Sequence, residues 1–113
     1  LWNGKMIKKI AIITIILLGA FSASNAENVY VKYQGTVSLD NFDCTNTISS
    51  FVNRICHNDK YDYVVVLLNT TYYHYCRIPS STVNSWLNAS SKGKFYLSNI
   101  KGRFDCRLGG IPK

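Results

Sequence analysis

Four cysteines that follow an N-terminal export signal are the feature that most constrains this chain. Met6-Ile7-Lys8-Lys9 forms a positive start, residues 10–21 are apolar, and small residues precede a predicted cut after Ala26. These three parts in this order define a secretory signal peptide. The apolar stretch, about a dozen residues, is shorter than the roughly 20 that a membrane-spanning helix needs. We therefore expect a bacterial periplasmic or secreted protein that keeps no stable membrane span after cleavage.

The expected domain organisation follows from this signal peptide, residues 6–26. Residues 1–5 precede Met6 and are interpreted as upstream, non-native sequence. Residues 27–113 then form a single domain, which contains every cysteine of the chain. Four cysteines in a short exported chain predict two disulfides, and each bridge stabilises a small domain by about 2–4 kcal/mol. The cysteines are Cys44, Cys56, Cys76 and Cys106.

Alternating apolar and polar residues, rich in β-branched and aromatic side chains, predict a sheet. Residues 29–39 are predicted as one strand with a bulge or bend at Gly35. Residues 50–57, 61–68 and 71–78 are predicted as three further strands separated by turn residues. The unbroken VVVLL run within residues 61–68 indicates a central strand that is buried on both faces. We expect these last three strands to form an antiparallel meander.

The segment after the sheet carries a helix signal. Ser80 or Ser81 can cap the first turn. Val83, Trp86 and Leu87 lie at positions i, i+3 and i+4, so they share one apolar face that we expect to pack on the sheet. The helix is predicted to end near residue 90.

Shorter elements are predicted near the C-terminus. Lys92-Gly93 is expected to interrupt the chain before a second short helix over residues 94–100, with Gly102 just past its end. Residues 104–107 are predicted as a closing strand. The predicted fold class is therefore α+β: a small antiparallel meander with one or two short helices on one face, linked by two disulfides.

The meander order limits the disulfide pairing. Cys56 and Cys76 lie on its outer strands, and the strand between them would separate the two by nearly 10 Å, because neighbouring strands are about 4.8 Å apart. A disulfide needs Cα atoms within about 7 Å. We therefore disfavour Cys56–Cys76, and with it Cys44–Cys106; the other two connectivities stay open.

Four groups of motifs follow one another between residues 49 and 104. They are an opening strand with Ser49-Ser50, Val52 and Ile55; the run Tyr73-His74-Tyr75 with Ile78-Pro79; a helix with Val83, Leu87 and Ser91-Lys92-Gly93; and the run Asn99-Ile100-Lys101-Gly102-Arg103-Phe104. In this order they resemble the KTSC domain, a family named for an extension at the C-terminus of some lysyl-tRNA synthetases. The whole mature chain resembles a secreted, four-cysteine branch of that family.

The resemblance implies a small domain without an established function, for which RNA binding has been proposed. Two positions depart from the family pattern: Cys56 stands where the family often has Gly, and Leu97 stands where it often has Asn. Because of the first departure, we do not carry the strand geometry of the family's cytosolic members over to this chain. Because of the second, the chain lacks the Asn side-chain amide that a family site could use at this position. RNA binding is the alternative function that this resemblance implies.

Basic residues gather at the C-terminal end of the chain. The net charge is +7, and residues 92–113 carry six basic side chains against one acidic side chain. Such a basic edge favours an anionic partner. Tyr73 and Tyr75 share one strand face, where they either stack bases beside these cations or pack within the sheet. The predicted anion or nucleic-acid site comprises Tyr73, Tyr75, Lys92, Lys94, Lys101, Arg103 and Arg107.

Two catalytic or metal interpretations are weaker than structural ones. His74 and Cys76 share a strand face as a base and a nucleophile would, but the sequence offers no third orienting group, and in an oxidising compartment Cys76 is expected in a disulfide. A zinc site of Cys56, His57, His74 and Cys76 is disfavoured, because adjacent strand residues point to opposite faces. We expect no enzyme activity, no cofactor and no metal.

The sequence therefore predicts an exported, non-catalytic binding module. Its expected partner is an anionic polymer or an acidic protein of the envelope or the extracellular space. RNA binding is the alternative, and a small hydrolase or an inhibitor of one is a third hypothesis that no motif supports.

Overall fold

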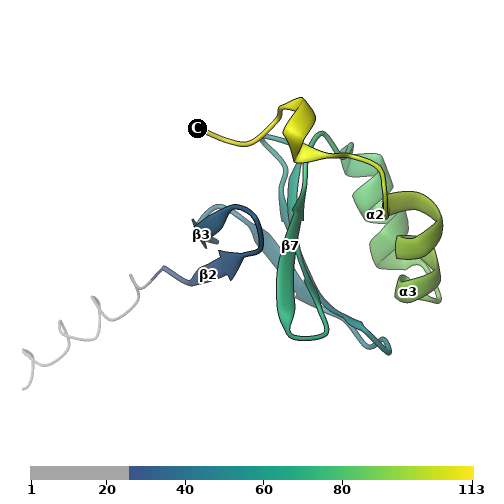
Figure 1. Cartoon of the computed structure of the whole chain (residues 1–113). Helices are drawn as coiled ribbons and strands as arrows, with labels where there is room; N and C mark the ends of the chain where they lie inside the picture. The colour runs from purple at the N-terminus through teal and green to yellow at the C-terminus, as the bar shows by residue number, and fades with distance from the viewer. Residues whose placement is uncertain (1–25) are drawn as a thin grey trace, which may run out of the picture.

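The computed structural model describes residues 26–113. The predicted signal peptide therefore lies outside the described residues, apart from Ala26. The described chain contains six strands followed by short helical segments (Figure 1). The strands are β2 (Asn28–Val31), β3 (Gly35–Ser38), β4 (Asp43–Asn46), β5 (Val52–Asn58), β6 (Tyr63–Leu68) and β7 (Thr71–Tyr75). The helical segments are α2 (Ser80–Asn88), α3 (Lys92–Phe95), the π-helical turn η3 (Tyr96–Ile100) and the 3₁₀ turn η4 (Cys106–Leu108).

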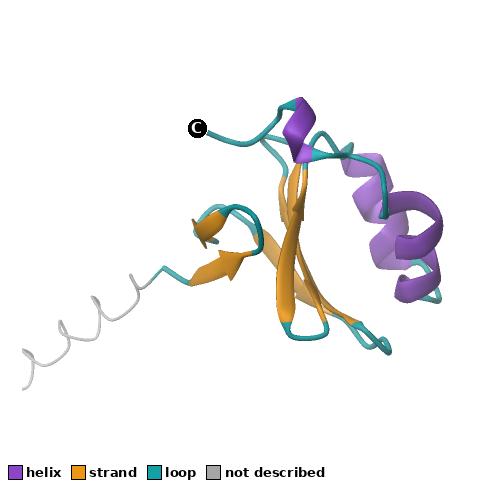
Figure 2. Cartoon of the chain, in the orientation of Figure 1, coloured by secondary structure: helices purple, strands orange, loops and turns teal. Residues whose placement is uncertain are grey.

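The six strands form one curled, mixed sheet in the order β3-β2-β7-β6-β5-β4. The predicted meander is present as β5, β6 and β7, which pair antiparallel. The expectation of a simple antiparallel sheet is wrong, because β2 pairs parallel with β7 through Val31 and Tyr72. This single bridge joins an N-terminal β2–β3 hairpin to the meander, and the hairpin lies apart from the helices (Figure 2).

The N-terminal strand predicted over residues 29–39 is two strands. The chain reverses between them, where the Gln34 N–H donates to the Val31 carbonyl and Tyr33 adopts a positive φ of 71°. Alternation continues through both arms of the hairpin, so the pattern alone does not reveal the turn. Strand β4 was not predicted, because its residues are polar and largely exposed; its pairing with β5 forms it.

Strand β6 is buried on both faces, as the VVVLL run predicts. Val64 and Val66 belong to a cluster that includes Val83, Trp86, Tyr96 and Ile100 of the helical segments. Val65 and Tyr63 belong to a second cluster, which includes Val31 of the hairpin and three of the cysteines. In Figure 2 the segments α2, α3 and η3 lie together on one side of the meander, whereas η4 lies at its end.

The helix boundaries differ from the predicted ones at two places. Pro79, not Ser80 or Ser81, is the N-cap of α2, and the Ser80 hydroxyl donates to the Asp59 carboxylate instead. Lys92-Gly93 does not interrupt the helix but begins α3, which Ser91 caps by accepting from the Lys94 N–H at 3.1 Å. Gly93 is buried, and glycine is required at this position because a Cβ would lie 2.7 Å from the Phe51 ring.

The C-terminal segment is a 3₁₀ turn rather than the predicted strand over residues 104–107. Phe104 has a positive φ of 56°, so the chain bends away from β7 after one backbone contact, in which the Cys76 N–H donates to the Phe104 carbonyl at 2.9 Å. Gly102 follows the helical segment with a φ of +77°, as predicted for a residue just past a helix end.

The disulfides join Cys44 to Cys56 and Cys76 to Cys106. This is one of the two connectivities that the meander order left open, and the disfavoured Cys56–Cys76 pairing is absent from the described residues. Cys44 and Cys56 are register partners on β4 and β5, while Cys76 and Cys106 tie the end of β7 to the C-terminal turn. Two disulfides fit an oxidising extracellular or periplasmic location.

Candidate functional site: a cationic cleft at the edge of β7

A cleft of about 790 Å³ lies along the free edge of β7. Three segments that are distant in the sequence form its walls: the tip of the β2–β3 hairpin, the second half of β7 and the C-terminal segment. The volume falls in the range of about 300–1,000 Å³ that is usual for ligand sites. Its lining residues are Lys32, Tyr33, Tyr73, His74, Tyr75, Gly102, Arg103, Asp105, Cys106 and Arg107.

The cleft exists because the edge of β7 opposite β6 is covered only at its two ends. On one side the hairpin touches β7 through Val31 and Tyr72, and its tip then turns away. On the other side the C-terminal segment contacts the end of β7 through Cys76, by one backbone hydrogen bond and one disulfide. The edge of β7 between Tyr72 and Cys76 is therefore left uncovered.

Four of the seven predicted site residues line this cleft. They are Tyr73, Tyr75, Arg103 and Arg107. Lys94 and Lys101 are exposed elsewhere, and the Lys92 ammonium donates to the Ala89 carbonyl at 2.6 Å, so these three are not part of the cleft. Sequence reasoning missed Lys32 and Tyr33, because only the folding of the hairpin brings them beside β7.

The two predicted tyrosines both pack and line the cleft. Their rings contact the helix-side cluster, and the Tyr75 hydroxyl lies 2.6 Å from the Tyr96 hydroxyl. Burial raises the pKa of Tyr75 far above its ordinary value. The Lys32 ammonium lies 5.8 Å from the centroid of the Tyr73 ring and 5.3 Å from that of Tyr33, within the range of cation–π attraction. The two tyrosines therefore pack against the helix-side cluster and also line the cleft, where Tyr73 lies beside the Lys32 ammonium.

His74 presents a defined ring nitrogen to the cleft. Its Nδ1 lies 2.9 Å from the Tyr63 hydroxyl. Burial raises the pKa of Tyr63 to about 12, so this hydroxyl keeps its proton. Burial lowers the pKa of His74, while the Asp105 charge opposes this shift, so the imidazole is neutral near pH 7. Taking the Tyr63 hydroxyl as the donor to Nδ1, we assign the neutral tautomer with the proton on Nε2.

The charges around the cleft are unevenly paired. Asp105 binds Arg107 at 2.6 Å, and this ion pair lowers the pKa of Asp105 to about 2. Within residues 26–113, the side chains of Lys32 and Arg103 have no acidic partner. These two cations stand on opposite walls of the cleft, one on the hairpin and one on the C-terminal segment. The site therefore offers positive charge to a ligand.

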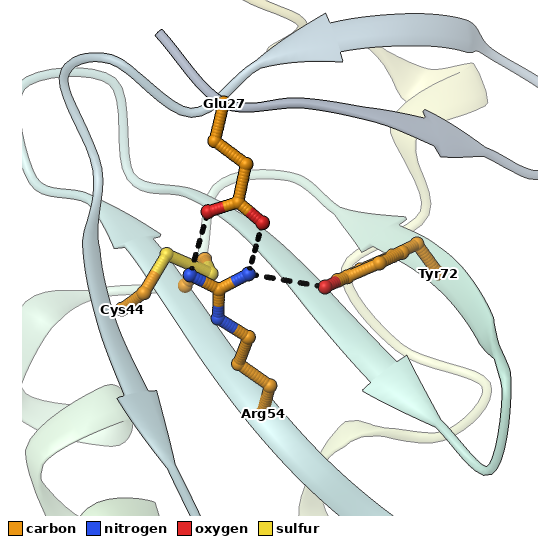
Figure 3. Close-up of polar contacts among 5 residues, drawn as sticks. Glu27, Cys44, Arg54 and Tyr72 are labelled. Atoms are coloured by element: carbon orange, nitrogen blue, oxygen red, sulfur yellow. Dashed lines mark hydrogen bonds and ion pairs between the residues drawn. A yellow bond between two sulfur atoms is a disulfide. The ribbon is translucent and has the colours of Figure 1, made fainter. Parts of the chain in front are cut away.

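A polar contact outside the cleft holds the β2–β3 hairpin against the meander. The Arg54 guanidinium donates to both Glu27 carboxylate oxygens, at 2.7 and 2.9 Å, and to the Tyr72 hydroxyl at 3.1 Å (Figure 3). Arg54 belongs to β5, whereas Glu27 directly precedes β2. The contact therefore ties the base of the hairpin to the meander, and it helps to fix the wall that carries Lys32.

Two other groupings bear on catalysis and metals. Cys56 and Cys76 are both in disulfides, so neither supplies a free thiol for the nucleophile or zinc arrangements considered above. His57, Asp59 and Asp62 place ligand-type atoms within 4.8 Å of one another near the β5–β6 turn. The Asp59 carboxylate accepts from Ser80, however, which gives it a structural contact with α2.

No helix among residues 26–113 is long and apolar enough to cross a membrane. The described residues form a disulfide-linked α+β domain, and its cationic cleft opens at the edge of β7.

Comparison with known proteins identifies the family. The model of the KTSC domain matches residues 49–104, and the chain belongs to this family. The crystal structure of a KTSC domain protein from Yersinia pestis is similar in fold, with a TM-score of 0.54 and 23% sequence identity over 57% of this chain and 92% of that one. A search of curated proteins finds no match. The family has no established function, so we infer the function of this protein from the residues of the cleft.

Proposed function

We propose that this protein is an exported, non-catalytic binding module and that the cleft at the edge of β7 holds its anionic partner. The observation that carries the proposal is that Lys32 and Arg103, which are distant in the sequence, line one cleft without an acidic partner among the described residues. Three basic side chains and one acidic side chain line the cleft, and a concave site with such an excess of positive charge concentrates anionic ligands. The two disulfides support a location outside the cytosol.

RNA binding is the second candidate. It is favoured by the joint presence of tyrosines and cations in one cleft, since aromatic faces stack bases while cations meet phosphates. Its difficulty is that Tyr73 and Tyr75 pack against the helix-side cluster, and Tyr75 also contacts Tyr96 through its hydroxyl. If the candidate holds, replacement of both tyrosines will abolish salt-sensitive RNA binding while the domain stays folded; intact binding will exclude it.

Charge reversal tests the anion site with a matched control. The variant Lys32→Glu/Arg103→Glu removes the two unpaired cations of the cleft. The control Lys94→Glu/Lys101→Glu makes the same change of net charge at exposed positions outside it. Heparin serves as the polyanion, and affinity is measured for both variants at low and physiological salt.

The cleft variant is expected to bind heparin about tenfold more weakly or worse, because two attractions become repulsions that salt screens. The control is expected to stay near the parent protein. Equal losses in both variants would show that net charge alone attracts the polyanion, and they would overturn the cleft as the site.

A further inference from the structure

The uncovered edge of β7 exposes main-chain groups as well as side chains. Alternate residues of a strand direct their N–H and C=O groups to the same edge. The Tyr72 carbonyl accepts from the Lys32 N–H at 2.9 Å, and the Cys76 N–H donates to the Phe104 carbonyl at 2.9 Å. His74 lies midway between them, so its N–H and C=O point to this same edge.

Within residues 26–113, neither outward main-chain group of His74 has a hydrogen-bond partner. The next bond of a parallel ladder would join the His74 N–H to the Lys32 carbonyl, but the hairpin has already turned away. The cleft occupies the space beside His74. The cleft therefore contains the main-chain N–H donor and C=O acceptor of His74. Lys32 lies on one of its walls and Arg103 on another.

The His74 side chain adds a second donor. In the tautomer assigned above, Nδ1 accepts from the Tyr63 hydroxyl and Nε2 carries the proton. Among the described side chains that are not exposed, the buried polar atom without a partner is His57 Nε2, so the unpartnered Nε2 of His74 is not buried. This N–H is thus accessible from the cleft that the imidazole lines.

We propose that the cleft binds its anionic partner as an extended acidic peptide segment, a deepening that rests on the proposed function. One peptide residue pairs with the main chain of His74, as in strand addition to a sheet edge. Acidic side chains of the peptide meet Lys32 and Arg103. An extended peptide carries an N–H and a C=O at the ladder spacing, whereas a glycan or a nucleic acid does not.

The proposal is tested with three synthetic peptides of equal charge. Acetyl-pentaglutamate amide is compared with two versions, one methylated at the odd-numbered amide nitrogens and the other at the even-numbered ones. Methylation keeps every carboxylate and removes the donors that a strand needs. We expect binding to weaken about fivefold for each main-chain hydrogen bond lost. The unmodified peptide should also slow hydrogen exchange of the His74 amide.

Two variants isolate the main chain of His74 itself. His74→Pro removes the outward N–H together with the imidazole, and a strand tolerates proline where that N–H forms no ladder hydrogen bond, as here among the described residues. His74→Ala removes the same imidazole and keeps the N–H. We expect the alanine variant to still discriminate against the methylated peptides, and the proline variant to lose affinity beyond the alanine variant.

The outcomes separate this inference from the proposed function. Equal binding of methylated and unmodified peptides, without protection of the His74 amide, would overturn strand pairing and leave the anion site intact. Binding of heparin but of none of the peptides would also overturn strand pairing and leave the anion site intact. If neither heparin nor the peptides respond to Lys32→Glu/Arg103→Glu, both proposals fail.

Discussion

At the scale of single residues, His74 connects the core of the domain to its cleft. The imidazole is hydrogen-bonded to Tyr63, a buried residue of β6, and it also lines the cleft. Tyr63 thereby fixes which ring nitrogen a ligand meets. The sequence suggests chemistry for His74 only through a catalytic pair with Cys76 or a zinc site that includes Cys76, and the Cys76–Cys106 disulfide removes both interpretations in the oxidised protein.

The protonation of His74 is the first prediction at this scale. Burial lowers its pKa below the ordinary value of 6.5. The unfolded chain therefore binds this proton at higher pH than the folded one, so the contribution of His74 to stability is present above that ordinary value and is lost as the pH falls below it. Titration by long-range ¹H–¹⁵N spectra should give a lowered pKa and a proton on Nε2 in the neutral form.

The control for this prediction is Tyr63→Phe. Without the hydroxyl donor, the neutral imidazole should populate both tautomers. A parent protein with the proton on Nδ1 would contradict the assigned hydrogen bond, and a His74 pKa above 6.5 would contradict the lowering that we attribute to burial.

At the scale of elements, the β2–β3 hairpin decides the shape of the cleft. One strand bridge and the Arg54 contact attach it to the meander, while Lys32 and Tyr33 at its tip form one wall. The Glu27 pKa is lowered, chiefly by the hydrogen bonds from Arg54. The ion pair therefore persists until the pH falls below the ordinary range of a glutamate.

Arg54→Met should loosen the hairpin and spare the meander. The substitution keeps a long apolar side chain but removes the donors to Glu27 and Tyr72. Hydrogen exchange should quicken at the amides of β2 and β3, with little change in β5 and β6. Arg107→Met is the matched control, since Arg107 pairs with Asp105 rather than with the hairpin. Exchange that rises equally in both variants would contradict the assigned role of Arg54.

The two disulfides should differ in stability and in function. Their cysteines are 30 residues apart for Cys76–Cys106 and 12 for Cys44–Cys56. Chain-entropy arguments therefore make the first worth about 1 kcal/mol more to the free energy of unfolding. It also holds the C-terminal wall of the cleft, so Cys76→Ala/Cys106→Ala should weaken heparin binding as well.

Urea unfolding and heparin titration of both double variants check this prediction. Cys44→Ala/Cys56→Ala is expected to lose stability but to keep its affinity for heparin. Loss of affinity in this variant, with retained affinity in Cys76→Ala/Cys106→Ala, would show that the C-terminal wall is not part of the site.

At the scale of the whole molecule, local patterns predicted the elements better than their assembly. The meander, the central position of residues 63–68 and the helix with Trp86 follow from patterns within short segments. The parallel bridge between Val31 and Tyr72 could not be predicted, because it joins segments that no local pattern relates. The same reason explains the site: Arg103 was found by its charge, whereas Lys32 reaches the cleft only through the fold of the hairpin.

The most direct test of the account is to map an anion on the surface of the oxidised protein. A heparin tetrasaccharide is titrated into ¹⁵N-labelled protein, and amide shift changes are followed residue by residue. The account predicts that they concentrate at Lys32, Tyr33, His74 and Arg103, around the cleft. Changes confined to the exposed lysines 94 and 101, with an unaffected β7 edge, would contradict it.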